Sequence, residues 1–419
     1  MRILFTVVVS CLVIASRVRC AESLSRREIT ADALRENPRL QAARARWEMI
    51  KERIPQAKAW DDPMVGVDVE RHGTTHFDTF SDNEWMISQA LPLSGKNRAR
   101  GRTAEAEALT AFEEVRRLEL EVVKEVRTAL ARLAGAYEQL EINARNQELL
   151  GQLTEISRTK YESGTRSQAD VLIAQTDLAR LSETKALLQR EVSDAQTQLN
   201  ILMNRPASAR LDNPPGLVFT PISWSQEKLE AFALANRPEV IKAQRQIEGE
   251  KARLQLARRQ WFPDPRFRVE AREFRESGRI QEYDTGVFFE VPWGNFRKYS
   301  AGVAETKKGL EAVQDEYDAV RTEVGGLVRD QLKRIETAAD NYRLFSQSIV
   351  PLARQTVEAT RSSYESDQTS FLELMTARRI QQDADSAQLK HLIDHEIAVA
   401  ELDAIIGRRA PFNQPGEEK

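Results

Sequence analysis

The sequence predicts a mainly α-helical protein with a small β part, built from two tandem copies of one unit of about 200 residues. Three features predict this: few helix-breaking residues, short segments of alternating apolar and polar residues, and sequence landmarks that recur at a fixed offset. Only 18 glycines and 15 prolines occur in 419 residues, and no proline lies between Pro92 and Pro206. This composition favours very long helices.

The repeat is visible in matching landmarks. ALRENP at 33–38 matches ALANRP at 233–238, and YES at 161–163 recurs at 364–366. The offset stays between 200 and 203 residues over five such landmarks. We therefore divide the chain into a signal peptide (1–20), repeat one (21–212) and repeat two (213–419, with a C-terminal tail from about 410).

Each copy has the same expected order of elements: a helix, a β-hairpin, a long outward helix and a shorter return helix. The outward helix of about 97–162 would be roughly 100 Å long at 1.5 Å per residue. Its return helix, about 167–203, is only half as long. We expect the helix at about 226–259 to complete copy one, and the helix at 26–59 to complete copy two. The outward and return helices of copy two are expected at about 296–364 and 371–406.

Alternating residues predict four strands in two hairpins, with polar loops at about 71–83 and 274–282. Alternation alone fits a small sheet in a soluble protein equally well. Tryptophans at or near the strand ends favour an aromatic girdle at a bilayer interface instead. Four strands cannot close a membrane barrel, which needs at least about 8, so several chains would have to contribute. The four tryptophans are Trp60, Trp85, Trp261 and Trp293.

The N-terminus has the layout of a secretory signal peptide, with an apolar run at 3–15. Cleavage after Cys20 would start the mature chain at Ala21 and remove Cys11 as well. The alternative, a lipidated Cys20, is disfavoured because Arg19 precedes it where a small residue is usual. After residue 15 no apolar stretch reaches about 18 residues, so strands would have to mediate any membrane contact.

Composition and motifs argue against other functions. A formal net charge of -3, from 61 Lys+Arg against 64 Asp+Glu, offers no basic surface for nucleic acid. Phosphate-binding glycine loops and CxxC motifs are absent, so we expect neither an enzyme nor a cofactor. The pairs His72/His76 and His391/His395 have the i,i+4 spacing of metal ligands. No acidic residue completes a motif, so we expect solvated surface histidines, with metal binding as the alternative.

Two segments carry a resemblance to a known family. The segment YESGTRSQADVL at 161–172 resembles the helical turn of TolC-type outer-membrane efflux proteins, and it recurs in part at the repeat offset. The segment SQALPLSGK at 88–96, just before the long helix, is similar to the heavy-metal-efflux branch of that family. The resemblance covers essentially the whole mature chain.

The resemblance implies a homotrimer whose chains share a twelve-strand barrel in the outer-membrane lipid and a helical tunnel across the periplasm. The tunnel would dock a periplasmic adaptor protein and an inner-membrane pump of the RND type. Its cargo would be metal cations, with organic compounds as the alternative, because the tunnel conducts what the pump delivers. The alternative is a soluble periplasmic coiled-coil adaptor or scaffold. Adaptors usually carry one helical hairpin flanked by compact β domains, whereas this chain predicts two long helical units.

The resemblance also suggests two sites at the far end of the helices. Asp367 and Glu373, each present three times around one axis, would form a cation-selective gate. The alternative is that both are solvated helix-end acids, because copy two departs from the motif, with Asp367 in place of glycine. The turns between outward and return helices would dock the adaptor. The candidate docking residues are Ser163, Gly164, Thr165, Arg166, Asp170 and Ser366.

Overall fold

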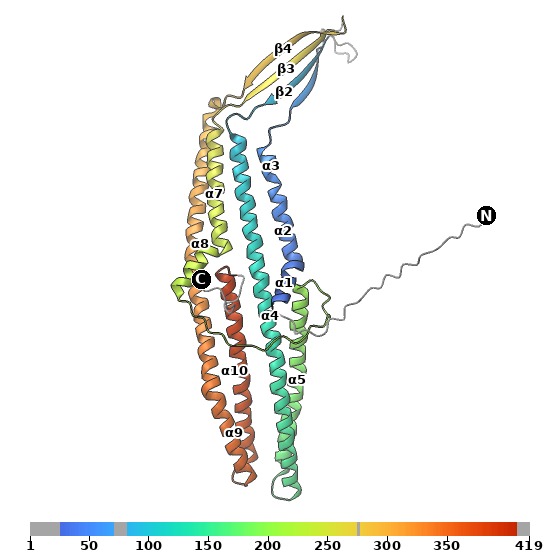
Figure 1. Cartoon of the computed structure of the whole chain (residues 1–419), viewed down its shortest axis with the longest axis vertical. Coiled ribbons are helices and arrows are strands. Elements are labelled where there is room, and N and C mark those ends of the chain that lie inside the picture. Colours follow the sequence, from blue (N-terminus) through green and yellow to red (C-terminus); the bar gives the residue numbers. More distant parts are fainter. Residues whose placement is uncertain (1–25, 71–81, 275–276, 409–419) are drawn as a thin grey trace, which may run out of the picture.

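The computed structural model describes residues 26–70, 82–274 and 277–408. The predicted signal peptide with its cysteines and the pair His72/His76 lie outside the described residues. The molecule is elongated, with a β-sheet at one end and two helical turns at the other (Figure 1). The element order confirms the two-copy architecture.

Copy one begins with three short helices and a hairpin, followed by the two long helices. Its elements are α1 (Arg26–Glu36), α2 (Pro38–Lys51), α3 (Arg53–Lys58), β1 (Met64–Glu70), β2 (Asp82–Ala90), α4 (Lys96–Glu162) and α5 (Gln168–Leu202). Copy two repeats the order, with a short helical turn η1 before its long helix and a π turn η2 within it. Its elements are α6 (Gln226–Asn236), α7 (Pro238–Arg259), β3 (Pro265–Phe274), β4 (Arg279–Phe289), η1 (Pro292–Asn295), α8 (Phe296–Leu344), η2 (Phe345–Ile349), α9 (Val350–Glu365) and α10 (Phe371–Ile405).

Both predicted short helices are broken at an X-Pro step, so the expectation of single helices is wrong. Asn37 and Arg237 precede Pro38 and Pro238 and are extended, with φ/ψ of -63/120° and -66/125°. The proline ring disfavours the helical region for the residue before it, and each proline then starts the next helix.

The prediction that each copy's short helices complete the other copy is also wrong. Asn37 Nδ2 donates to the carbonyl of Leu202 at 3.0 Å, and the Arg237 guanidinium donates to that of Ile405 at 3.4 Å. Each break therefore lies against the end of its own return helix. The apolar faces agree: α1 packs on the end of α5, and α6 and α7 pack on the end of α10.

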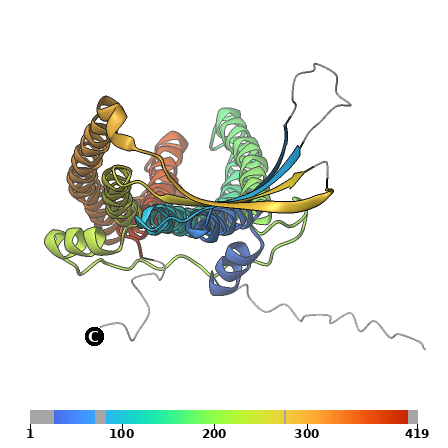
Figure 2. The ribbon, with the colours of Figure 1, turned by 90° about the horizontal axis from the view of Figure 1, so that it is seen from above.

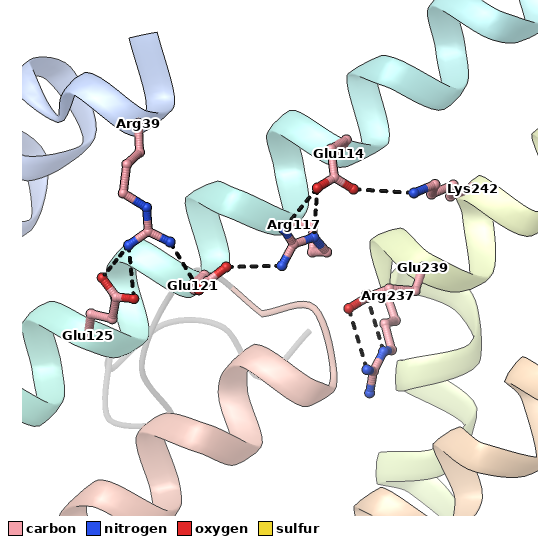
Figure 3. A network of polar contacts seen from close by, with 8 residues as sticks. All are labelled: Arg39, Glu114, Arg117, Glu121, Glu125, Arg237, Glu239 and Lys242. Atoms are coloured by element: carbon pink, nitrogen blue, oxygen red, sulfur yellow. Dashed lines mark hydrogen bonds and ion pairs between the residues drawn. The ribbon is translucent and has the colours of Figure 1, made fainter. Parts of the chain in front are cut away.

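Helix α4 lies at the centre of the helical part, packed on α1–α3, α5, α7 and α10 (Figure 2). Its apolar residues form one hydrophobic cluster with α1 and α5, and a separate cluster joins α6, α7, α8 and α10. Ion pairs also connect α4 to α2 and to α7 (Figure 3). Arg39 of α2 lies 3.1 Å from both Glu121 and Glu125, and Lys242 of α7 lies 3.3 Å from Glu114. The sheet end and the tips are thus held apart by one continuous helix of 67 residues.

The four strands form one antiparallel sheet in the order β1-β2-β3-β4. The four predicted strands and two hairpins are confirmed. The connection between β3 and β4 is shorter than the loop predicted at about 274–282. Trp85 lies inside β2, opposite Val67 and Ala271, and not at a strand end. Pairing with β1 and β3 extends β2 back to Asp82, so Trp85 lies in the middle of the strand. Within the described part of the chain, no helix is both long and apolar enough to span a bilayer.

Candidate functional site

The two turns at the helical tip share one backbone conformation. Gly164 has φ of 71°, and Asp367, at the equivalent place in copy two, has φ of 60°. This left-handed region is open to glycine and is tolerated by aspartate more readily than by most side chains. Asp367 therefore takes the place of glycine without changing the backbone conformation of the turn. Unlike glycine, it also provides a carboxylate that can bind other residues.

The Asp367 carboxylate binds two cations of the copy-one turn. Its Oδ1 lies 2.8 Å from Lys160 Nζ and 3.2 Å from Arg166 Nη2. The hydrogen bond from Lys160 is the main reason that the pKa of Asp367 lies below its ordinary value. Arg166 also donates to the Thr369 carbonyl at 2.9 Å. Two residues predicted for different roles, Arg166 and Asp367, are thus brought together.

Tyr364 lies beneath these ion pairs and was missed by the sequence analysis. Its side chain is fully buried, its Oη lies 3.4 Å from Ser157 Oγ, and its ring packs on Phe371. Lys160 Nζ and the Arg166 guanidinium lie 4.8 and 5.3 Å from the ring centroid, within cation–π range. Lys160 was missed too, although a cation just before the turn could have suggested a pair with Asp367. We call Lys160, Arg166, Tyr364 and Asp367 the tip cluster.

The remaining predicted tip residues engage their own turns. The exposed Ser163 and Thr165 hydroxyls both donate to the Lys160 carbonyl, at 3.0 and 2.8 Å. Ser366 Oγ donates to the Ser362 carbonyl at 3.0 Å. These bonds shape the turns and leave their outer surface open to solvent.

Asp170 and Glu373 occupy the first turns of α5 and α10. A helix N-terminus favours negative charge there. Partial burial raises the pKa of Asp170, and the charge of Arg166 opposes that shift. Glu373 forms no ion pair with any described residue, and its backbone N–H donates to Ser370 Oγ at 3.2 Å. Within one chain, Asp367 is thus paired with cations of the other copy, whereas Glu373 has no ion-pair partner among the described residues.

At the other end, the sheet exposes an apolar face. The register aligns Val67, Trp85, Ala271 and Tyr283 across the four strands, so these side chains share one face. Trp85 is 48% exposed and Tyr283 is 70% exposed. A contiguous apolar surface of this kind marks a membrane or protein contact.

His391 and His395 are not the solvated pair that the sequence predicted. His395 is fully buried on α10 against the Phe219 ring, at 4.6 Å between centroids, and neither ring nitrogen has a hydrogen-bond partner. Burial lowers its pKa to about 4. His391 is half-buried and packs on Phe345. Among described residues, the one group of three potential metal ligands is elsewhere, on the sheet. The surface expectation is therefore wrong for His395, because the connection between α5 and α6 covers it.

Comparisons with known proteins agree with this architecture. The model of the family described as outer membrane efflux protein matches residues 29–205 and again 231–408. The outer-membrane channel OprN is 19% identical, with a TM-score of 0.75 over 91% of this chain and 89% of its own. CusC is 16% identical, with a TM-score of 0.79 over 91% and 92%. VceC from Vibrio cholerae is 16% identical, with a TM-score of 0.77 over 91% and 96%.

The family model covers most of the chain in two copies, which agrees with the repeat. The resemblance to outer-membrane efflux proteins is confirmed. The alternative of a soluble adaptor is set aside, because the family that matches is one of outer-membrane efflux proteins. The protein is therefore an outer-membrane protein. The chain belongs to the outer membrane efflux protein family and is an efflux channel.

Proposed function

We propose that three copies of this chain form one channel, joining their sheets edge to edge as a twelve-stranded barrel and their helices as a periplasmic tunnel. The β-sheet is the main observation that supports this proposal. Its apolar face is exposed, and its edge strands β1 and β4 have no further strand partner among the described residues. Because a barrel needs at least about 8 strands, one sheet of four cannot close alone.

The mass of the detergent-solubilised protein tests the trimer, and a mass that fits one or two chains would contradict it. Two variants of β4 test the membrane face. Val287 lies on the apolar face, and Glu282 lies on the opposite one. We expect Val287→Arg to reduce trimer recovered from membranes, because arginine facing lipid costs about 2–4 kcal/mol at mid-bilayer. Glu282→Arg is the matched control.

We propose the tip as the docking surface for a periplasmic adaptor, which links the channel to an inner-membrane pump of the RND type. Its support is position: the turns lie at the end of α4 opposite the sheet, and their outer surface is exposed. Cysteines replacing Ser163 or Ser366 should crosslink to the adaptor in cells. A cysteine replacing Ser277, in the turn between β3 and β4, is the control. Crosslinking from Ser277 alone would reverse the proposed orientation.

For the gate, we propose a ring of Asp367 and Glu373 around the trimer axis that selects cations. The Asp367 side chain is 55% exposed and ionised at neutral pH, although Lys160 and Arg166 balance its charge. Glu373 has no ion-pair partner among the described residues, so it is the carboxylate of the pair whose charge is not balanced within one chain. Repeated carboxylates around a narrow axis attract cations. Single-channel recordings compare the wild type with the double variant Asp367→Ala and Glu373→Ala. An unchanged cation/anion permeability ratio would exclude this ring as the constriction.

Metal cations are the proposed cargo. Besides the sequence resemblance, the polar face of the sheet gives support: Glu84, Glu270 and Asp284 place carboxylate oxygens within 4.8 Å of one another. Arg268 neutralises part of this charge, at 2.9 Å from Glu270. Cells lacking the gene should lose tolerance to copper, zinc or cobalt salts and regain it with the wild-type gene. Loss of tolerance to organic compounds alone would contradict a metal cargo.

A further inference from the structure

Three exposed arginines lie next to the sheet, where α4 begins and α7 ends. Arg98 and Arg102 fall within the first turns of α4, in a segment of about 10 Å. Arg258 is the last residue but one of α7. The two helix ends lie side by side, because Arg102 Nη1 donates to Gln255 Oε1 at 3.1 Å. We call Arg98, Arg102 and Arg258 the arginine face.

The arginine face points away from the polar face of the sheet. A pocket where sheet and helices meet is lined by Lys96 and Arg100 of α4, Gln260 at the C-cap of α7 and Arg266 of β3. Arg266 shares the polar face of β3 with Glu270, because residues four apart on a strand point to one side. Each residue of the arginine face stands two positions from one of the helical pocket residues. Side chains two positions apart on a helix point roughly 160° apart, so the arginine face lies on the side of the apolar sheet face.

No charge of the described chain accounts for this set of cations. A helix N-terminus favours negative charge, yet the first turn of α4 has no acidic residue. The first acid of α4 is Glu105, and Lys58 binds it at 2.6 Å. The arginine face forms no ion pair with a described residue. Even with Asp62, which is exposed before β1, an excess of positive charge remains on a chain whose formal net charge is -3.

Exposed apolar side chains lie in the segments that join the sheet to the helices. Trp60, Leu93 and Trp293, next to α3, α4 and α8, are 60%, 71% and 63% exposed. Tryptophan is enriched where the hydrocarbon of a bilayer meets its headgroups. The headgroup layer adds only about 5–7 Å on each side of the hydrocarbon, and the long arginine side chain can place its guanidinium there. The arginine face therefore lies at the headgroup level of the leaflet that borders the helices.

We propose that the arginine face binds the phosphates of anionic phospholipids in the periplasmic leaflet of the outer membrane. Guanidinium groups bind phosphate oxygens in pairs, and each cation at an anionic membrane surface strengthens binding roughly fivefold. Three chains place their arginine faces around the base of one barrel, where the bound lipids fix its height in the bilayer. This inference rests on the proposed barrel, because the apolar face of the sheet must face lipid.

Native mass spectrometry of the detergent-solubilised protein tests the arginine face. The protein is titrated with phosphatidylglycerol and, separately, with zwitterionic phosphatidylcholine that has the same acyl chains. We expect the wild-type trimer to bind phosphatidylglycerol roughly tenfold more tightly or better. Arg98→Gln combined with Arg102→Gln should lose most of this preference. An equal preference in the wild type and in this double variant would overturn the proposal.

Arg145→Gln combined with Lys185→Gln is the matched control. Both residues are exposed cations of α4 and α5 on the tip side of the helices, and the double variant removes the same charge. We expect it to keep the wild-type preference; an equal loss in the control would show that only net charge matters and would also overturn the proposal. A protein without a trimer mass would contradict the proposed barrel. A trimer without any lipid preference would contradict the arginine face alone.

Discussion

The long outward helices of the two copies have the same place in the repeat and different surroundings. In copy one, α4 runs without interruption and has buried residues along most of its length. In copy two, α8 and α9 are separated by the π turn at Phe345–Ile349, and buried residues appear only from Val324 onward. The two copies therefore share the same order of elements. How much of each long helix is buried depends on which other helices surround it in the folded chain.

A single proline accounts for the interruption. Pro351 follows the π turn and has no N–H to donate to the carbonyl four residues before it. The equivalent residue of copy one, at the offset of 203, is Glu148, and α4 continues through it as a regular helix. The exposed side of α8 and α9, with Leu344 and Leu352 at 52% and 62% exposure, agrees with the proposed contact with another copy.

The largest expected difference between the two helices is in core substitutions. Leu133→Ala in α4 removes a side chain that is 1% exposed, which should lower the free energy of unfolding by about 2–5 kcal/mol. Leu344→Ala in α8 should cost much less in the isolated chain. Chemical denaturation in detergent measures both. Equal costs would show that Leu344 is as buried in the assembled channel as Leu133 is within one chain.

A pH scan of unfolding should reveal the contribution of His395 to the pH dependence of stability. Burial lowers its pKa from 6.5 to about 4, so the folded state favours the neutral ring. As the pH falls from 6.5 toward 4, the unfolded chain takes up the proton first, and stability falls by up to about 3 kcal/mol. His395→Phe should remove this part of the slope, while His391→Phe keeps it. A slope unchanged in both variants would contradict the assigned cause.

Glycines offer a matched pair on the two long helices. A Cβ on Gly135 of α4 would lie 2.2 Å from Ile393 Cδ1, whereas a Cβ on Gly325 of α8 meets nothing within 4 Å. Gly135→Ala should therefore destabilise, because the forced repacking of α10, typically about 1–3 kcal/mol, outweighs a gain in helix propensity of about 0.5–1 kcal/mol. Gly325→Ala should stabilise by about 0.5–1 kcal/mol, through helix propensity. Thermal unfolding measures both; destabilisation by Gly325→Ala would indicate contact with another chain there.

The smallest expected change in stability is at the tip, where Asp367 is exposed. Asp367→Asn keeps a residue that tolerates positive φ and removes the charge that binds Lys160 and Arg166. Spin labels on Ser163 and Ser366 should report a broader distance distribution between the turns.

A control variant and the pH dependence of the wild type accompany that experiment. Glu365→Gln, which removes only a pair with Arg361 on the same helix, should leave the distance distribution unchanged. Because the pKa of Asp367 lies below its ordinary value, the wild-type contact should persist at mildly acidic pH. It should be lost only as the pH falls below about 4 and through the lowered pKa. A distribution in Asp367→Asn identical to that of the wild type would show that the ion pairs do not hold the turns together.

Local patterns in the sequence determined the elements themselves. Long runs of helix-forming residues predicted α4 to within one residue of its bounds, alternation predicted all four strands, and the constant offset predicted the repeat. These features depend on residues close together in the chain, where period and propensity decide. The same patterns did not reveal the breaks at Asn37 and Arg237, although the prolines after them were a readable signal.

Tertiary packing decided which faces meet. The sequence could not show that α1 lies on α5, that Phe219 covers His395, or that Lys160 and Arg166 bind Asp367 from the other copy. Each of these contacts joins residues far apart in the chain. Helical period fixes which residues share a stripe, whereas the partner of that stripe depends on the path of the connecting segments and on burial of the whole chain.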